Sequence, residues 1–133
     1  MEIESRVGQV MASQKYVFQL LSDFNNIAKF IPNEQVSDFV SDADSCSFTI
    51  NNIGKFGMRI IEREPSKLLK IANDYQVPFS FNMWIQLKDV DTKDTRVKIT
   101  LRAELNPLLK VVAQKPLTSF VEALVTKMET IRE

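Results

Sequence analysis

The segment from Thr95 to Leu105 most constrains the fold, because it alternates apolar and polar side chains and leads directly into a long amphipathic segment. Its apolar side chains fall at every second position, at Val97, Ile99, Leu101, Ala103 and Leu105. This period of two predicts a strand with one buried and one solvated face. The buried face needs a partner, and the segment that follows supplies one.

After Asn106-Pro107 the chain carries a single apolar stripe at helical spacing, formed by Leu117, Phe120, Val121, Leu124, Val125, Met128 and Ile131. This spacing predicts a helix that ends near Arg132 and packs its stripe against the same core. Pro116 interrupts the pattern, because proline cannot donate to the Val112 carbonyl and its ring clashes with that group. We therefore predict a kink or a restart between Val112 and Leu117.

The remaining chain predicts more strands and two short helices. An opening strand is expected at about residues 2–10, followed by helices that begin after Ser13, bend near Asp23 and end at Pro32. Turn-rich segments then separate five strand candidates, at about residues 35–40, 46–52, 55–63, 67–76 and 80–90. Together with the strands at 2–10 and 95–105 they make a seven-stranded antiparallel sheet in one α+β domain spanning residues 1–133.

Composition excludes several classes of function. The chain has no histidine, which removes the usual general base and the commonest metal ligand, and its single cysteine, Cys46, cannot form an internal disulfide. Seventeen basic residues balance seventeen acidic ones, so no net field favours nucleic acid or an anionic membrane surface. The charged N-terminus and the lack of a long apolar run predict a soluble, cytoplasmic protein without integral membrane association.

The order of these elements resembles the SRPBCC superfamily, which includes START-type lipid carriers, birch-pollen-allergen-like proteins and polyketide cyclases. The resemblance rests on Tyr16-Val17-Phe18, Leu21-Ser22-Asp23-Phe24, Ile31-Pro32, Asn106-Pro107 and Lys115-Pro116-Leu117. It implies a helix-grip fold, in which a curved antiparallel sheet wraps around the long C-terminal helix and two short helices lie between strands 1 and 2. It also implies a hydrophobic cavity between sheet and helix, with Leu108, Leu109 and Val112 beside a mouth that flexes to admit a guest.

Alternation along the strands indicates which residues would line such a cavity. The predicted ligand-binding residues are Phe56, Met58, Ile60, Asn73, Tyr75, Phe81, Met83, Ile99, Leu101, Phe120 and Leu124. Tyr75 and Asn73 are the expected polar anchors, and Phe48 and Ser5 also face inward. The same apolar side chains would equally form an ordinary packed core.

Three other residues allow alternative interpretations. Glu62, if buried, would have a raised pKa and serve as the general base of a cyclase or dehydratase, whereas a solvated strand end would leave it without a role. Cys46 lies on an apolar strand and is interpreted as a buried, inert thiol. Trp84 is predicted on the outer face in a row with Ile61, Ala72 and Arg102, where Arg102 stacks on the indole or the row marks a contact surface.

The leading hypothesis is a noncatalytic binding or carrier domain for a hydrophobic small molecule, a lipid or an aromatic compound. The alternatives are a polyketide cyclase/dehydratase-like enzyme that uses Glu62 or Tyr75, and a protein-interaction domain whose interior is filled by its own side chains. We predict no catalytic residues, no metal site, no cofactor and no nucleic-acid partner. The protein is expected to be a monomer or a weak homodimer.

Overall fold

The computed structural model describes residues 1–31, 34–74 and 77–133. Its elements follow the chain in the order β1 (Glu2–Glu4), β2 (Gly8–Val10), α1 (Gln14–Leu21), α2 (Phe24–Ile27), η1 (Ala28–Phe30), β3 (Val36–Ser41), β4 (Ser45–Ile50), β5 (Gly54–Glu64), β6 (Leu68–Asn73), β7 (Phe81–Asp91), β8 (Asp94–Ala103) and α3 (Pro107–Met128). The predicted architecture, an antiparallel sheet around a long C-terminal helix with short helices after the opening strand, is confirmed.

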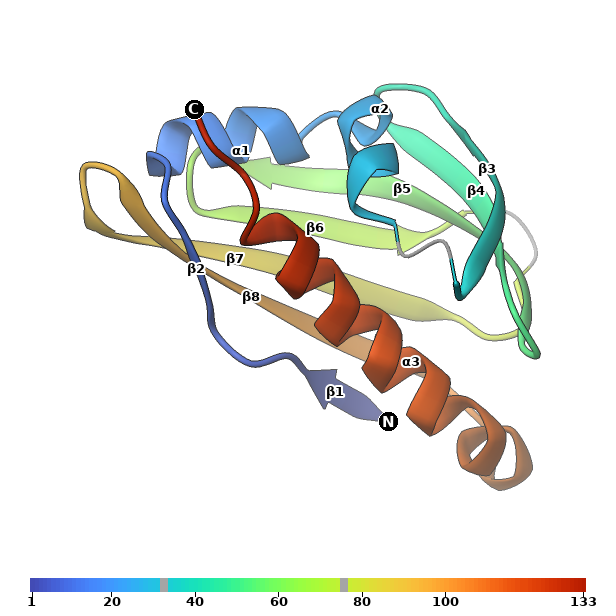
Figure 1. Ribbon diagram of the computed structural model, residues 1–133. Helices are drawn as coiled ribbons and strands as arrows, with labels where there is room; N and C mark the ends of the chain where they lie inside the picture. Colours follow the sequence, from blue (N-terminus) through green and yellow to red (C-terminus); the bar gives the residue numbers. More distant parts are fainter. Residues whose placement is uncertain (32–33, 75–76) are drawn as a thin grey trace.

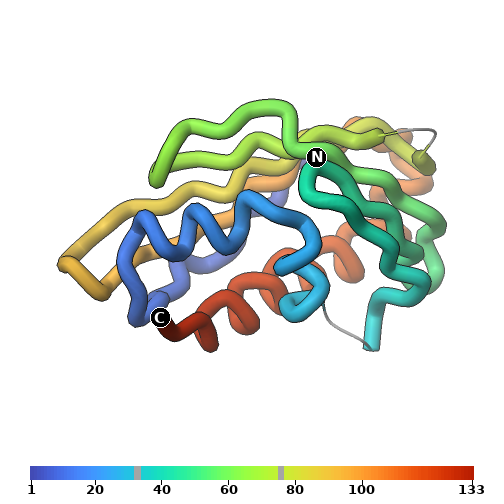
Figure 2. The backbone as a smooth tube through the Cα atoms, turned by 90° about the horizontal axis from the view of Figure 1, so that it is seen from above, coloured from blue at the N-terminus to red at the C-terminus, as the bar shows by residue number. Residues whose placement is uncertain are grey.

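The strands form one eight-stranded sheet in the order β1-β8-β7-β6-β5-β4-β3, in which β2 also pairs with β8. The meander from β3 to β8 explains most of this order, because short turns make consecutive strands antiparallel neighbours. Helix α3 lies across one face of the sheet, and α1 lies on that same side (Figures 1 and 2). The core fills the space between these helices and the sheet.

Alternation predicted the buried face of the sheet well. The inward positions of β4, β5 and β7 are all buried, at Cys46, Phe48, Ile50, Phe56, Met58, Ile60, Phe81, Met83, Ile85 and Leu87. The register shift between Ile60 and Glu62 falls at the end of the buried part of β5, so it does not move the inward side chains. Sheet and helices share one hydrophobic core.

The opening strand differs from its prediction, because it is divided into β1 and β2 at Ser5. The Ser5 hydroxyl accepts a hydrogen bond from the Ile99 N–H at 2.9 Å and donates one to the Arg6 carbonyl at 2.7 Å. A side chain therefore takes over part of the strand ladder, and the backbone of Arg6 turns to donate to Glu122 of α3. The sheet thus has eight strands where seven were predicted.

Helix α3 begins at Asn106-Pro107, as predicted, and continues through Pro116, where a kink or restart was predicted. Asn106 caps it by accepting from the Leu109 N–H at 2.8 Å, and Pro107 occupies the first turn. The predicted restart at Pro116 is wrong, since the helix runs unbroken from Pro107 to Met128. The proline is tolerated because Val112, whose carbonyl loses its helical partner, lies on the exposed side of the helix. No helix among the described residues is long and apolar enough to cross a bilayer.

Candidate functional site

A small void lies between the sheet and α3, at the predicted place. It measures about 20 Å³, and its wall consists of ten apolar residues: Phe48, Ile50, Phe56, Met58, Phe79, Phe81, Met83, Leu101, Leu117 and Phe120. Strands β4, β5, β7 and β8 form one side of the void and α3 the other. A cavity needs about 10–15 Å³ to hold one water molecule, so the void has room for about one water.

Phenylalanine rings form half of this wall. Phe48 stacks on Phe120 of α3 with ring centroids 5.7 Å apart, and Phe56 meets Phe48 at 6.1 Å. Phe56 also packs edge-on against Phe79 at 5.2 Å and Phe81 at 5.8 Å. The rings form a contiguous aromatic cluster from the helix to the sheet, at the centroid distances favoured by aromatic pairs.

The structure brings six of the predicted ligand-binding residues to the void, namely Phe56, Met58, Phe81, Met83, Leu101 and Phe120. Ile60, Ile99 and Leu124 are buried in the core outside its wall. Tyr75, the preferred polar anchor, lies outside the described residues.

Asn73 and Ser5, the other inward polar residues, are engaged with the backbone. The Asn73 side-chain oxygen accepts from the Phe81 N–H at 3.0 Å, which extends the pairing of β6 and β7 beyond the last ladder pair. The Asn73 side chain therefore acts at the sheet margin and does not line the void. Ser5 is likewise satisfied by the backbone of Ile99 and Arg6.

A surface groove of about 340 Å³ leads toward the void from outside. It is formed by Glu34, Gln35, Ile50, Asn51, Asn52, Lys115, Pro116 and Ser119. Ile50 belongs to the walls of both the groove and the void, so the two features are neighbours at this side chain. The side-chain oxygen of Gln35 is buried there without a hydrogen-bond partner among the described residues. We call this feature the Pro116 groove.

The turn between β4 and β5 gives the groove its far wall. Asn52 has a φ of 69° and Gly54 a φ of 137°, both in the region that ordinary side chains avoid. A Cβ at Gly54 would also lie 3.1 Å from the Pro78 ring. This close approach holds the turn against the segment before β7.

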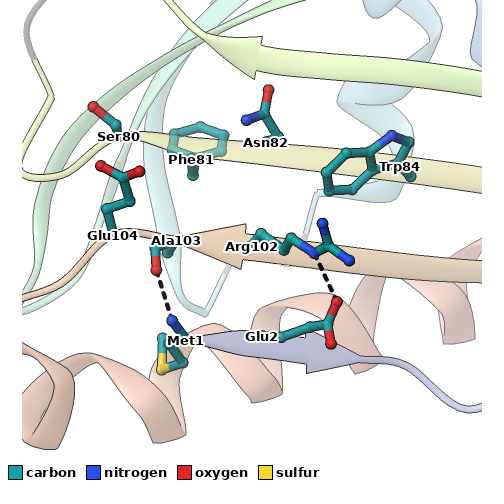
Figure 3. A pocket seen from close by; sticks show the side chains of 9 residues that line it. All are labelled: Met1, Glu2, Ser80, Phe81, Asn82, Trp84, Arg102, Ala103 and Glu104. Atoms are coloured by element: carbon teal, nitrogen blue, oxygen red, sulfur yellow. Dashed lines mark hydrogen bonds and ion pairs between the residues drawn. The ribbon is translucent and has the colours of Figure 1, made fainter.

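A much larger hollow than the void, about 670 Å³, lies on the outer face of the sheet, away from α3 (Figure 3). It is a wide furrow over β1, β7 and β8 that includes Glu2, Asn82, Trp84, Arg102 and Glu104. The Arg102 Nε donates to Glu2 at 2.8 Å across it. Its polar, open form offers little burial to a guest, so we assign the candidate binding site to the inner void and the Pro116 groove.

Trp84 lies on this outer face, as predicted, and two cations flank its ring. The guanidinium carbon of Arg102 lies 5.4 Å from the ring centroid and Lys70 Nζ lies 5.5 Å from it. The predicted stack with Arg102 is confirmed. The predicted row is wrong, because Trp84 pairs with Lys70 and Thr100, while Ala72 pairs with Asn82.

Two titratable residues singled out in the sequence lie apart from the void. Glu62 is exposed on β5, which removes it as a desolvated general base. Cys46 is buried, and its burial, with a smaller effect from the charge of Asp42, raises the pKa of the thiol to about 12. Such a thiol is inert at neutral pH. Within residues 1–31, 34–74 and 77–133 no three histidine, cysteine, aspartate or glutamate side chains are grouped to hold a metal ion.

Sequence reasoning placed Phe79 in a turn and did not include it among the site residues. Phe79 is buried and forms part of the void wall. Its burial could have been predicted, because Phe79 and Phe81 are two positions apart and therefore share a face that begins before the strand itself. Leu117 belongs to the apolar stripe predicted for the helix, and the structure brings it to the void together with Ile50 of β4.

Comparison with solved structures identifies the fold. A START superfamily protein from Mycobacterium smegmatis matches with a TM-score of 0.68 and 14% identity, covering 98% of this chain and 99% of that one. The Zhui aromatase/cyclase from Streptomyces matches with a TM-score of 0.67 and 12% identity, covering 97% and 93%. The two-domain aromatase/cyclase BexL matches with a TM-score of 0.73 and 12% identity, covering 97% of this chain and 45% of that one.

No family model matches the sequence, and no curated protein matches it. The structural likeness therefore carries the assignment, and at these identities it establishes the fold alone. The chain has the START-like helix-grip fold that the sequence predicted.

Proposed function

We propose that this chain binds a hydrophobic small molecule, a lipid or an aromatic compound, between its sheet and α3. The observation that carries the proposal is the apolar wall of ten residues around a void that shares Ile50 with the Pro116 groove. Burial of an apolar guest there would contribute about 25 cal/mol per Å² of surface removed from water.

The void must enlarge for a guest to enter. At about 20 Å³ it falls far below the roughly 300 Å³ of an ordinary ligand pocket. Opening the Pro116 groove and displacing Ile50 and Phe120 is the shortest route. The guest would then occupy the space that the phenylalanine rings fill in its absence.

The polar residues of the groove suit a guest with one polar end. The buried Gln35 oxygen accepts a donor, and Lys115, in the same groove, pairs with an anionic or hydrogen-bonding group. An amphipathic molecule would place its apolar part beyond Ile50 and its polar part beside these two side chains.

One observation favours a second candidate function, a protein-interaction domain with a filled core. The void holds no more than one water, which is the packing expected when a core is complete without a guest. In this case the outer furrow around Trp84 and Arg102 would be the contact surface.

Titration with the fluorescent probe N-phenyl-1-naphthylamine tests guest binding. We expect saturable binding by the unmodified protein and tighter binding by Phe120→Ala, because that substitution enlarges the void. Leu124→Ala is the matched control, since Leu124 is buried on the same helix but outside the void wall. Native mass spectrometry of protein purified from its host shows in addition whether a lipid or aromatic molecule copurifies.

If Leu124→Ala raises the affinity for the probe as much as Phe120→Ala does, the probe binds outside the void. If neither the unmodified protein nor Phe120→Ala binds the probe and nothing copurifies, the filled-core function replaces the binding function.

A further inference from the structure

Three large apolar side chains are exposed on the first turns of α3. Leu108 and Val111 are each 79% exposed and Val112 is 51% exposed. Their spacing of three and four residues puts them on one side of the helix, opposite the buried stripe that contains Ala113 and Leu117. We call Leu108, Val111 and Val112 the α3 apolar face.

The position of this face makes it accessible to a large partner. In Figure 1 the first turns of α3 lie outside the outline of the sheet, whereas the later turns lie across it. The face is therefore a convex projection. A convex projection can insert into a lipid surface, whereas it offers no concave pocket for a small molecule.

The charged residue on this face is basic. Between Leu105 and Val121 the charged residues are Lys110 and Lys115 alone. Lys115 lies three and four positions after Val112 and Val111, so it is on the same side of the helix. The N-terminal end of α3 adds a partial positive charge, and the nearest acidic residues flank the face, with Glu104 before the cap and Glu34 across the Pro116 groove.

The size of the face distinguishes between two occupants. Three side chains cover at most a few hundred Å². A stable contact between two copies of this chain would need about 800 Å² from each. A bilayer interface has no such minimum, because its affinity grows with whatever apolar area enters it and with each nearby basic side chain.

We propose that the α3 apolar face docks on the surface of an anionic lipid bilayer, with Leu108, Val111 and Val112 in the headgroup region and Lys115 against the lipid phosphates. The whole-chain charge balance does not oppose this, because Lys115 and the N-terminal end of α3 are local to the face. Docking places the Pro116 groove, which shares Lys115, next to the bilayer. It does not depend on whether the interior takes a guest.

Cosedimentation of the purified protein with vesicles tests the proposal. One set contains equal amounts of phosphatidylcholine and phosphatidylglycerol, and the other contains phosphatidylcholine alone. We expect binding to the anionic vesicles and weaker binding to the neutral ones. Changing Leu108, Val111 and Val112 together to glutamine should lower the partition coefficient by about tenfold or more. Lys115→Gln should lower it by about fivefold on anionic vesicles, and Lys110→Gln, on the opposite side of the helix, should lower it less.

The matched control is the double variant Val40→Gln and Val90→Gln, which removes two other exposed valines on β3 and β7. It should bind as the unmodified protein does. Because all these positions are exposed, the variants should keep the circular dichroism spectrum and unfolding midpoint of the parent.

Three results would overturn the proposal. The first is no binding to either vesicle, and the second is binding that the control lowers as much as the triple variant. The third is a concentration-dependent dimer that the triple variant abolishes, which would assign the face to a second copy. Probe binding in the interior is measured without vesicles, so failure of one proposal does not entail failure of the other.

Discussion

The two halves of α3 share one helix and face opposite environments. From Leu117 to Met128 the apolar side chains are buried against the sheet, and the outward positions are polar. From Pro107 to Lys115 three large apolar side chains point outward, at Leu108, Val111 and Val112, while Leu109 packs half-buried against the core and Ala113 is buried. Apolar residues in the second half complete the core, whereas the three outward ones in the first half remain available for a partner.

The N-terminal strands reinforce this difference by holding the second half. The Arg6 guanidinium donates to Glu129 at 2.7 Å, and the Gln9 N–H donates to the same carboxylate at 2.9 Å. Farther along, the Ser13 N–H donates to Glu133 at 2.7 Å. The first half lies beyond these contacts. The N-terminal segment therefore fastens the second half of the helix and makes none of these contacts with the first.

Phe120→Ala should have the largest effect, because it removes a buried ring from the second half. Phe120 is 4% exposed and stacks on Phe48, so we expect a loss of about 3–5 kcal/mol in the free energy of unfolding. Urea denaturation measures this loss. Phe120→Leu keeps an apolar side chain and should lose about 1–2 kcal/mol. A loss below about 1 kcal/mol for Phe120→Ala would mean that the second half is no more fixed than the first.

Gly8→Ala should weaken the contact between β2 and the second half. A Cβ at Gly8 would lie 2.6 Å from Cγ1 of Val125 and 3.2 Å from Cγ1 of Val97, so neighbours must shift. We expect a cost of about 1–3 kcal/mol in unfolding free energy. The cost should shrink in a Val125→Ala background, which opens the space. Equal costs in both backgrounds would show that Gly8 does not press on the helix.

Glu129→Gln should remove a smaller contribution, and one that depends on pH. The hydrogen bond from Arg6, followed by that from the Gln9 N–H, lowers the pKa of the Glu129 carboxyl. A lowered folded pKa stabilises the fold above the ordinary glutamate pKa, and this contribution disappears as the pH falls through the folded value. The surface position limits it to about 0.2–1 kcal/mol near neutral pH. Urea denaturation at neutral and acidic pH should show the difference at neutral pH only. A difference that persists in acid would have another cause.

Val111→Ala should have the smallest effect, because it changes the exposed side of the first half. Alanine favours a helix more than valine does, so the unfolding free energy should change by no more than about 0.5 kcal/mol, with an increase expected. Thermal unfolding beside the unmodified protein measures it. A loss above about 1 kcal/mol would show that Val111 packs against something within the chain.

Local patterns predicted most of the fold. The period of two assigned the inward residues of β4, β5, β7 and β8, Ser13 was found as the cap of α1, and Asn106 and Pro107 marked the start of α3. The break at Ser5 was missed, because it depends on a hydrogen bond to Ile99, 94 positions away. The continuation through Pro116 was missed because a kink prediction considers the helix without its surroundings.

The candidate site was predicted less completely. Faces were assigned correctly. Which of the inward residues line the void depends on where the sheet and the helix separate, and alternation carries no information about that distance. Ile60, Ile99 and Leu124 face inward yet pack fully, whereas Ile50 and Phe79 reach the void. The partners of Trp84 were misassigned because β7 pairs with both β6 and β8 in a register two residues away from the predicted one. A register shift leaves little trace in sequence.

Backbone amide hydrogen exchange followed by mass spectrometry tests the central claim, that the two halves of α3 differ in stability. We predict that amides from Val111 to Lys115 exchange through local opening, much faster than those from Val121 to Lys127, which should require global unfolding. N-phenyl-1-naphthylamine or anionic vesicles should slow exchange in the first half. Equal protection of the two halves in the free protein would contradict the account.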